Sequence, residues 1–169
     1  DIFYIQSIAE RKKRWMMSRT YTVTLGSFKS RALVYRALRK AECWVHVRAE
    51  DMLQRAVRTM SPKKVQVRLV VLSVAELGFA EASYQEVCAR AHQLGYAFCS
   101  AEVGFLLRLR YLDQKGSESL YIAMEPMLNP ADPFIFVLTK GFGGLLLYSE
   151  WAHPHSLFCA KDQFVFVQS

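Results

Sequence analysis

The fold of this chain is decided by residues 83–125, SYQEVCARAHQLGYAFCSAEVGFLLRLRYLDQKGSESLYIAME. The stretch opens on Ser83-Tyr84-Gln85-Glu86, in which the Ser83 hydroxyl can accept from the Glu86 amide while the Glu86 carboxylate accepts from the Ser83 amide. Apolar residues at helical spacing follow this capping box, and Gly95 stands where a left-handed residue closes a helix. The pattern predicts a helix over residues 84–94.

The second part of the stretch changes from helical periodicity to the alternation that is typical of strands. Apolar and polar side chains alternate in Leu107 to Tyr111 and in Ser119 to Glu125, on either side of the turn-forming residues 113–116. With those four residues as the loop, Leu109 faces Leu120 and one side of the pair is wholly apolar. The alternation therefore predicts an amphipathic hairpin.

The polar side of this hairpin is the first candidate site. Guanidinium groups beside an aromatic ring suit phosphate, carboxylate or a stacked base. A pocket here for a small anionic ligand would be lined by Glu102, Arg108, Arg110, Tyr121 and Glu125. A solvated sheet face with cross-strand packing explains the same pattern, and we favour it because an amphipathic hairpin always needs a polar side.

Further elements are expected on both sides of this stretch. One helix is predicted to begin at Ser27 or Ser30, and a second is predicted over residues 45–60, where Ser61-Pro62 ends it. Strands are predicted where β-branched and aromatic residues cluster, at residues 20–25, 65–74, 134–139, 145–149 and 164–168.

The order of these elements predicts the fold class. Pro126, Pro130 and Pro133 predict a loop after the hairpin, because proline cannot donate a hydrogen bond within a sheet. Helices then come mainly before a run of about five antiparallel strands. This order predicts an α+β fold, in which about three helices pack on one face of a twisted, mainly antiparallel sheet.

Length and composition predict a single domain without a membrane span. The 169 residues can bury about two-thirds of the surface of the unfolded chain. No apolar run reaches the roughly 18 residues that cross a bilayer. We expect residues 17–169 to form one domain, and residues 1–16, with the basic run Arg11 to Arg14, to be a leader or a segment added for expression.

Positive charge is concentrated in the first half of the chain. The net charge is +7, but residues 1–79 carry 16 basic and 6 acidic residues, whereas residues 80–169 carry 6 and 9. The helices expected there would form a second candidate site, for a nucleic acid or an acidic protein. Its residues are Arg31, Arg36, Arg39, Lys40, Arg48, Arg55 and Arg58. Solvated helix faces explain the same charges, since acidic residues interrupt the patch and no compact nucleic-acid-binding motif is present.

Metal and thiol chemistry have weaker support. In His153-Pro154-His155 two imidazoles lie close in sequence, but the proline makes a surface turn the better explanation of His153 and His155. The four cysteines show no Cys-x-x-Cys spacing, which predicts reduced thiols and a cytoplasmic location. We therefore expect no metal and no cofactor.

Several segments of the last two-thirds of the chain carry a resemblance. They are VVLSVAELGF (70–79), CARA (88–91), AEVG (101–104), LLRLRY (106–111) and IAMEP (122–126). Together they resemble a family of small uncharacterised bacterial proteins, over about residue 65 to the C-terminus. The resemblance implies a bacterial, cytoplasmic origin, and it transfers no catalytic residue.

Three functions are compatible with these patterns. The first is a non-catalytic binding module that engages an acidic partner, nucleic acid or protein, through the basic helical half. The second is a small-molecule-binding protein or enzyme that uses the Glu/Arg/Tyr pocket. The third is a structural or homo-oligomerisation domain, since a hydrophobic content of 52% leaves apolar surface to cover.

Overall fold

The computed structural model describes residues 18–168, which form four helices and eleven strands. The helices are α2 (Arg31–Lys40), α3 (Val47–Ala56), α4 (Tyr84–Gln93) and α5 (Glu102–Arg110). The strands are β1 (Thr20–Leu25), β2 (Trp44–Val45), β3 (Val65–Ser73), β4 (Glu81–Ser83), β5 (Tyr96–Ala97), β6 (Leu120–Ile122), β7 (Met127–Asn129), β8 (Asp132–Gly141), β9 (Gly144–Trp151), β10 (Leu157–Cys159) and β11 (Gln163–Gln168). The leader predicted at residues 1–16 lies outside the described residues.

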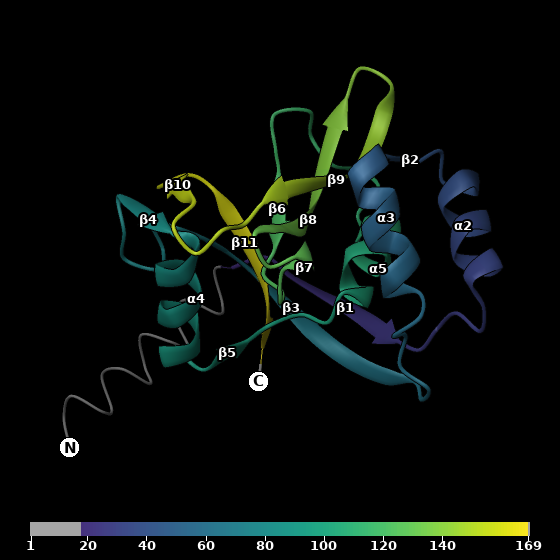
Figure 1. Cartoon of the computed structure of the whole chain (residues 1–169), viewed down its shortest axis with the longest axis horizontal. Helices are drawn as coiled ribbons and strands as arrows, with labels where there is room; N and C mark the ends of the chain where they lie inside the picture. The colour runs from purple at the N-terminus through teal and green to yellow at the C-terminus, as the bar shows by residue number, and fades with distance from the viewer. Residues whose placement is uncertain (1–17, 169) are drawn as a thin grey trace.

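Nine of these strands form one sheet, with the order β1-β3-β11-β6-β8-β9-β2; outside this order, β5 pairs with β11 and β7 pairs with β8. Strands β4 and β10 form a separate two-stranded sheet. Helices α2, α3 and α5 gather at one end of the molecule, while α4 lies at the other end beside β4 and β10 (Figure 1). No helix in residues 18–168 is long and apolar enough to cross a membrane.

The fold prediction of about three helices on a mainly antiparallel sheet is wrong. There are four helices in the described chain, and the large sheet is mixed. Strand β11 runs parallel to β6, and the edge strand β2 runs parallel to β9. Parallel pairing joins segments that are far apart in the sequence, so the local patterns that indicate hairpins do not reveal it.

The predicted hairpin is also wrong, because its first strand is helix α5. Residues 102–108 are all buried, so the helix has no polar face to produce the usual periodicity. Gly104 makes this packing possible, since an added Cβ would lie 2.4 Å from the Phe136 ring. The second predicted strand is present as β6, but it pairs with β8 and β11.

The locally encoded elements are confirmed. Helix α4 begins with the complete capping box of Ser83 and Glu86, and Ser30 caps α2 by accepting from the Leu33 amide. The strand predictions before and after the helices correspond to β1, β3, β8, β9 and β11. The loop predicted at the prolines is wrong, since β7 and β8 form a tight hairpin with Asn129 opposite Asp132.

Candidate functional site

Glu102, expected in a ligand pocket, is a buried structural residue. Its carboxylate is in the first turn of α5, and the residue is 2% exposed. Oε2 accepts from the Gly26 amide at 2.6 Å, and Oε1 accepts from the Ser61 amide at 3.0 Å. Gly26 has a φ of +72°, a conformation that favours glycine. Glu102 therefore ties together the loops that follow β1 and precede β3.

Arg108 is also removed from solvent, with an exposure of 0%. Its Nη1 donates to Gln114 Oε1 at 2.7 Å and to the carbonyls of Thr139 and Leu146 at 3.1 and 3.0 Å. Its Nη2 donates to the Tyr111 carbonyl. Burial lowers the pKa of the guanidinium, and no carboxylate of residues 18–168 forms an ion pair with it. The prediction that Arg108 faces solvent is wrong; it joins α5 to the β8–β9 pair.

The other three residues of the predicted pocket lie elsewhere. Arg110 is exposed at the end of α5, and Glu125 is exposed after β6. The half-buried Tyr121 stacks on Phe164, with ring centroids 5.3 Å apart, and burial raises the pKa of Tyr121 to about 12. The five side chains thus belong to different parts of the fold and do not converge on one ligand.

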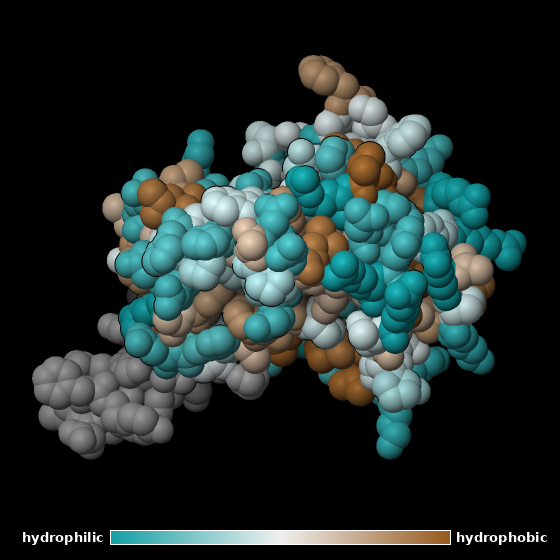
Figure 2. Space-filling view, in the orientation of Figure 1, coloured by the Kyte–Doolittle hydropathy of each residue, from teal (hydrophilic) through white to brown (hydrophobic). Residues whose placement is uncertain are grey.

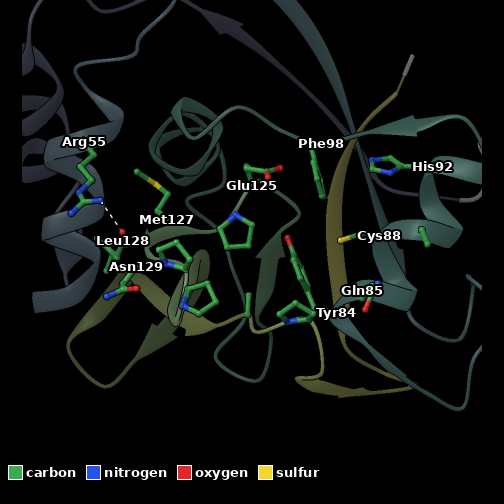
Figure 3. A pocket seen from close by; sticks show the side chains of 16 residues that line it. Arg55, Tyr84, Gln85, Cys88, His92, Phe98, Glu125, Met127, Leu128 and Asn129 are labelled. Atoms are coloured by element: carbon green, nitrogen blue, oxygen red, sulfur yellow. Dashed lines mark hydrogen bonds between the residues drawn. The ribbon is translucent and has the colours of Figure 1, made fainter.

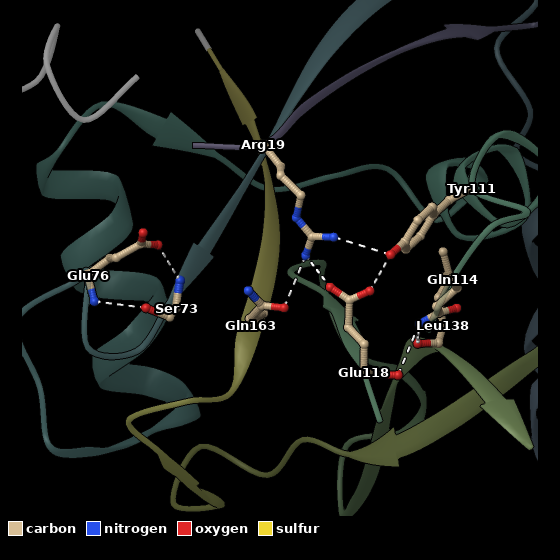
Figure 4. Close-up of polar contacts among 8 residues, drawn as sticks. All are labelled: Arg19, Ser73, Glu76, Tyr111, Gln114, Glu118, Leu138 and Gln163. Atoms are coloured by element: carbon tan, nitrogen blue, oxygen red, sulfur yellow. Dashed lines mark hydrogen bonds and ion pairs between the residues drawn. The ribbon is translucent and has the colours of Figure 1, made fainter. Parts of the chain in front are cut away.

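A polar hollow of about 560 Å³ lies beside Tyr121. Arg19 and Glu118 form an ion pair in this hollow, and Glu118 also accepts from the Tyr111 hydroxyl (Figure 4). Arg19 also donates to the Tyr111 hydroxyl at 3.2 Å and to Gln163 Oε1 at 3.1 Å. Burial and the bond to Glu118 raise the pKa of Tyr111 to about 12. These groups satisfy one another, and the exposed Lys115 and Lys161 line the same hollow.

A more apolar groove of about 790 Å³ lies between α4, the β7–β8 hairpin and α3 (Figure 3). Four of the five prolines line it, namely Pro126, Pro130, Pro133 and Pro154. At one end Arg55 donates to the Leu128 carbonyl at 3.2 Å, and at the other His92 packs edge-on against Phe98 at 4.9 Å. The segments that line the groove are brought together only by the fold. The signal of the groove in the sequence was the cluster of prolines.

This groove has no activated nucleophile. Burial raises the pKa of the Cys88 thiol to about 12, so the thiol stays protonated at neutral pH. The Tyr84 hydroxyl beside it donates to the Met124 carbonyl at 2.6 Å, and burial raises its pKa as well. Groups held in their neutral, hydrogen-bonded forms suit binding better than catalysis.

The second candidate site, formed by the basic residues of the N-terminal helices, agrees with the structure better than the first candidate site does. All seven basic residues predicted on the two N-terminal helices are exposed; six lie on α2 and α3, and Arg58 lies two residues after the end of α3. Two of them contact aromatic rings: the Arg31 guanidinium lies 5.3 Å from the Tyr35 ring centroid, and the Arg48 guanidinium lies 4.1 Å from the Phe134 ring centroid. The one ion pair found in residues 18–168 is elsewhere, between Arg19 and Glu118. Hydrophilic side chains accordingly gather over α2 and α3 (Figure 2).

Aromatic side chains that the sequence analysis did not single out border this basic face. A hollow of about 720 Å³ between α2 and β2 is lined by Arg31, Tyr35, Arg39 and Trp44, among others. Trp44 is 64% exposed, although most tryptophans are largely buried. The signal in the sequence was a tryptophan in the short link between two basic helices.

The histidine pair forms a turn. His153 Nδ1 accepts from the His155 amide at 3.3 Å, and the His153 ring stacks on Trp151 at 5.3 Å. Within residues 18–168 no group of three potential metal ligands comes together.

Comparison of the chain with models of protein families, with curated proteins and with solved structures gives no match.

Proposed function

We propose that this protein is a binding module that engages an anionic partner through the exposed basic face of α2 and α3. The observation that carries the proposal is the concentration of unpaired positive charge. Residues 27–64 contain ten basic and three acidic residues, a net charge of +7. The remainder of residues 18–168 contains eight basic and ten acidic residues, a net charge of −2. The described molecule is therefore strongly polarised toward one end.

Solubility and helix stability account for only part of this charge. Arg39 and Lys40 lie in the last turn of α2, where cations stabilise the helix dipole by about 0.3–1 kcal/mol each. That role does not extend to Arg31 and Arg36 earlier in α2 or to Arg48 near the start of α3. Solubility needs net charge but not its collection on one face. Attraction of a polyanion explains the arrangement directly.

Fluorescence anisotropy with labelled polyanions tests this function. The panel contains single-stranded DNA, double-stranded DNA and polyglutamate, each measured at about 50 mM salt, where electrostatic binding is strong. We expect the double variant Arg39→Gln/Lys40→Gln to bind its preferred polyanion about tenfold more weakly than wild type. The matched control, Lys115→Gln/Lys161→Gln, removes the same charge from exposed sites on the opposite half of the chain and should bind almost normally.

Two outcomes would contradict the proposal. Equal weakening in both double variants would show that net charge alone attracts the polyanion. Loss of binding on removal of residues 1–16 would assign it to the basic run Arg11 to Arg14.

We also infer a cytoplasmic location for this binding function. All four cysteines are free thiols, and Cys43, Cys88 and Cys99 are buried. Reduced thiols are usual in reducing compartments and uncommon in secreted proteins of this size. Fractionation of the native host cells tests this inference, and recovery in a secreted or membrane fraction would contradict it.

A further inference from the structure

We propose that the anionic partner is a single-stranded nucleic acid whose bases stack on Trp44 and its aromatic neighbours while its phosphates contact the arginines of α2. This inference rests on the proposed function and specifies its ligand. It follows from a hollow at the edge of the large sheet that is lined by both aromatic rings and guanidinium groups, and from a second, aromatic hollow beside it.

The first hollow combines charge and aromatic surface. Arg31, Tyr35 and Arg39 are contributed by α2, and Trp44 by the edge strand β2. Single-strand-binding proteins use this combination, in which cations follow the backbone and exposed rings accept bases. Because stacking requires only the flat face of a base, such a surface binds many sequences.

The two rings of this hollow are held in place. The Tyr35 hydroxyl donates to Glu50 Oε1 at 2.6 Å, and Trp44 Nε1 donates to the Gly143 carbonyl at 3.2 Å. A ring that is already positioned loses less conformational freedom on binding. The exposed Trp44 ring is therefore held in a fixed orientation in which a partner can stack on it.

A second hollow, of about 440 Å³, continues the surface on the other side of Trp44. Trp44 and Val45 line both hollows, so the two are contiguous. In the second, the His46 and Tyr148 rings lie 4.4 Å apart, and Tyr148 is 38% exposed. The surface thus runs from the arginines of α2 past Trp44 to a further aromatic pair.

The chemistry of this strip favours a single strand over the other polyanions. In a duplex the base faces are covered by their neighbours, so the exposed rings of this strip would find no base face to stack on. An acidic peptide would pair with the arginines but would bring no regular series of flat rings for Trp44 and Tyr148. A single-stranded nucleic acid supplies both groups at every residue.

Binding of labelled oligothymidylate, about 12 nucleotides long, tests the inference against an abasic strand of the same length, which has the phosphates but no bases. We expect wild type to bind oligothymidylate at least about tenfold more tightly than the abasic strand. Trp44→Leu should remove most of that difference and leave abasic binding unchanged. The control is Trp151→Leu, which alters a tryptophan that is 43% exposed and lies outside both hollows, and it should behave as wild type.

Tyr148→Ser is a second variant of the strip and should weaken oligothymidylate binding in the same direction. Equal affinity of wild type for the two strands, with no effect of Trp44→Leu or Tyr148→Ser, would overturn the stacking proposal. If Arg39→Gln/Lys40→Gln still weakened both strands in that case, the proposed anion binding would stand. Binding of polyglutamate but of no oligonucleotide would also overturn this inference alone. Failure to bind any polyanion would overturn both proposals.

Self-association through the exposed rings is a different explanation of their exposure, and a separate measurement tests it. Light scattering over a range of concentrations should show the same mass for wild type and Trp44→Leu. A dimer that Trp44→Leu abolishes would assign the strip to self-association and overturn the inference.

Discussion

Replacement of the buried Arg108 by methionine should strongly destabilise the fold. The change keeps an unbranched apolar side chain of similar length but removes every donor. Four acceptors then lose their partner, namely Gln114 Oε1 and the carbonyls of Tyr111, Thr139 and Leu146. At a net value of about 1 kcal/mol for each hydrogen bond, the loss is about 4 kcal/mol.

An opposing effect makes this prediction informative. Arg108 is a buried charge without a carboxylate partner in the described chain, and burial lowers its pKa. Removing a charge from a low-dielectric site is itself favourable. We expect the lost hydrogen bonds to outweigh this gain, because the acceptors on Gln114 and Tyr111 belong to buried residues and gain no water in exchange.

Urea unfolding followed by tryptophan fluorescence measures the change in the free energy of unfolding. Arg108→Lys, which retains the charge and fewer donors, should lose about half as much as Arg108→Met. The control is Arg110→Met on the same helix, an exposed position where the change should stay within about 0.5 kcal/mol. If Arg108→Met lost no more than Arg110→Met, the reasoning that this network stabilises the fold would be refuted.

Three further predictions address other contacts. Glu102→Gln should lower the free energy of unfolding by about 1–3 kcal/mol in the same assay, because the amide keeps only one of the two acceptor oxygens. Gly26→Ala should destabilise by more than about 1 kcal/mol, since the new Cβ would lie 2.4 Å from the Lys63 carbonyl oxygen, whereas Gly116→Ala enters open space and should be nearly neutral. Titration of the thiols at mildly alkaline pH should detect Cys159 first, because burial raises the thiol pKa of the other three cysteines. Rapid reaction of all four thiols in the folded protein would contradict this expectation.

The sequence revealed the parts of the fold that are encoded locally. Ser83 and Glu86 lie three residues apart, and their capping box needs no other part of the chain, so α4 was predictable. The alternation of leucine and arginine in residues 106–110 favoured a strand, but the helix there is determined by burial against β1, β8 and β9. The partners of Arg108 at Thr139 and Leu146 are about thirty residues or more away in sequence, so its burial could not be read locally.

The candidate site likewise has a part that could be predicted from the sequence and a part that could not. The exposure of the basic residues on α2 and α3 followed from helical periodicity and is confirmed. The aromatic strip was not predictable, because β2 has only two residues and joins the sheet through a parallel pairing of Trp44 with Leu146. That pairing brings Trp44 beside Gly143 and close to the basic helix.

The basic face is tested most directly by the salt dependence of oligothymidylate binding in wild type and in Arg39→Gln/Lys40→Gln. For a single strand, each neutralised phosphate contributes about 0.7 to the slope of log affinity against log salt concentration. If both residues contact phosphates, the slope of the double variant should be shallower by about 1.4, while Lys115→Gln/Lys161→Gln keeps the wild-type slope. A slope that is unchanged in Arg39→Gln/Lys40→Gln would contradict the account.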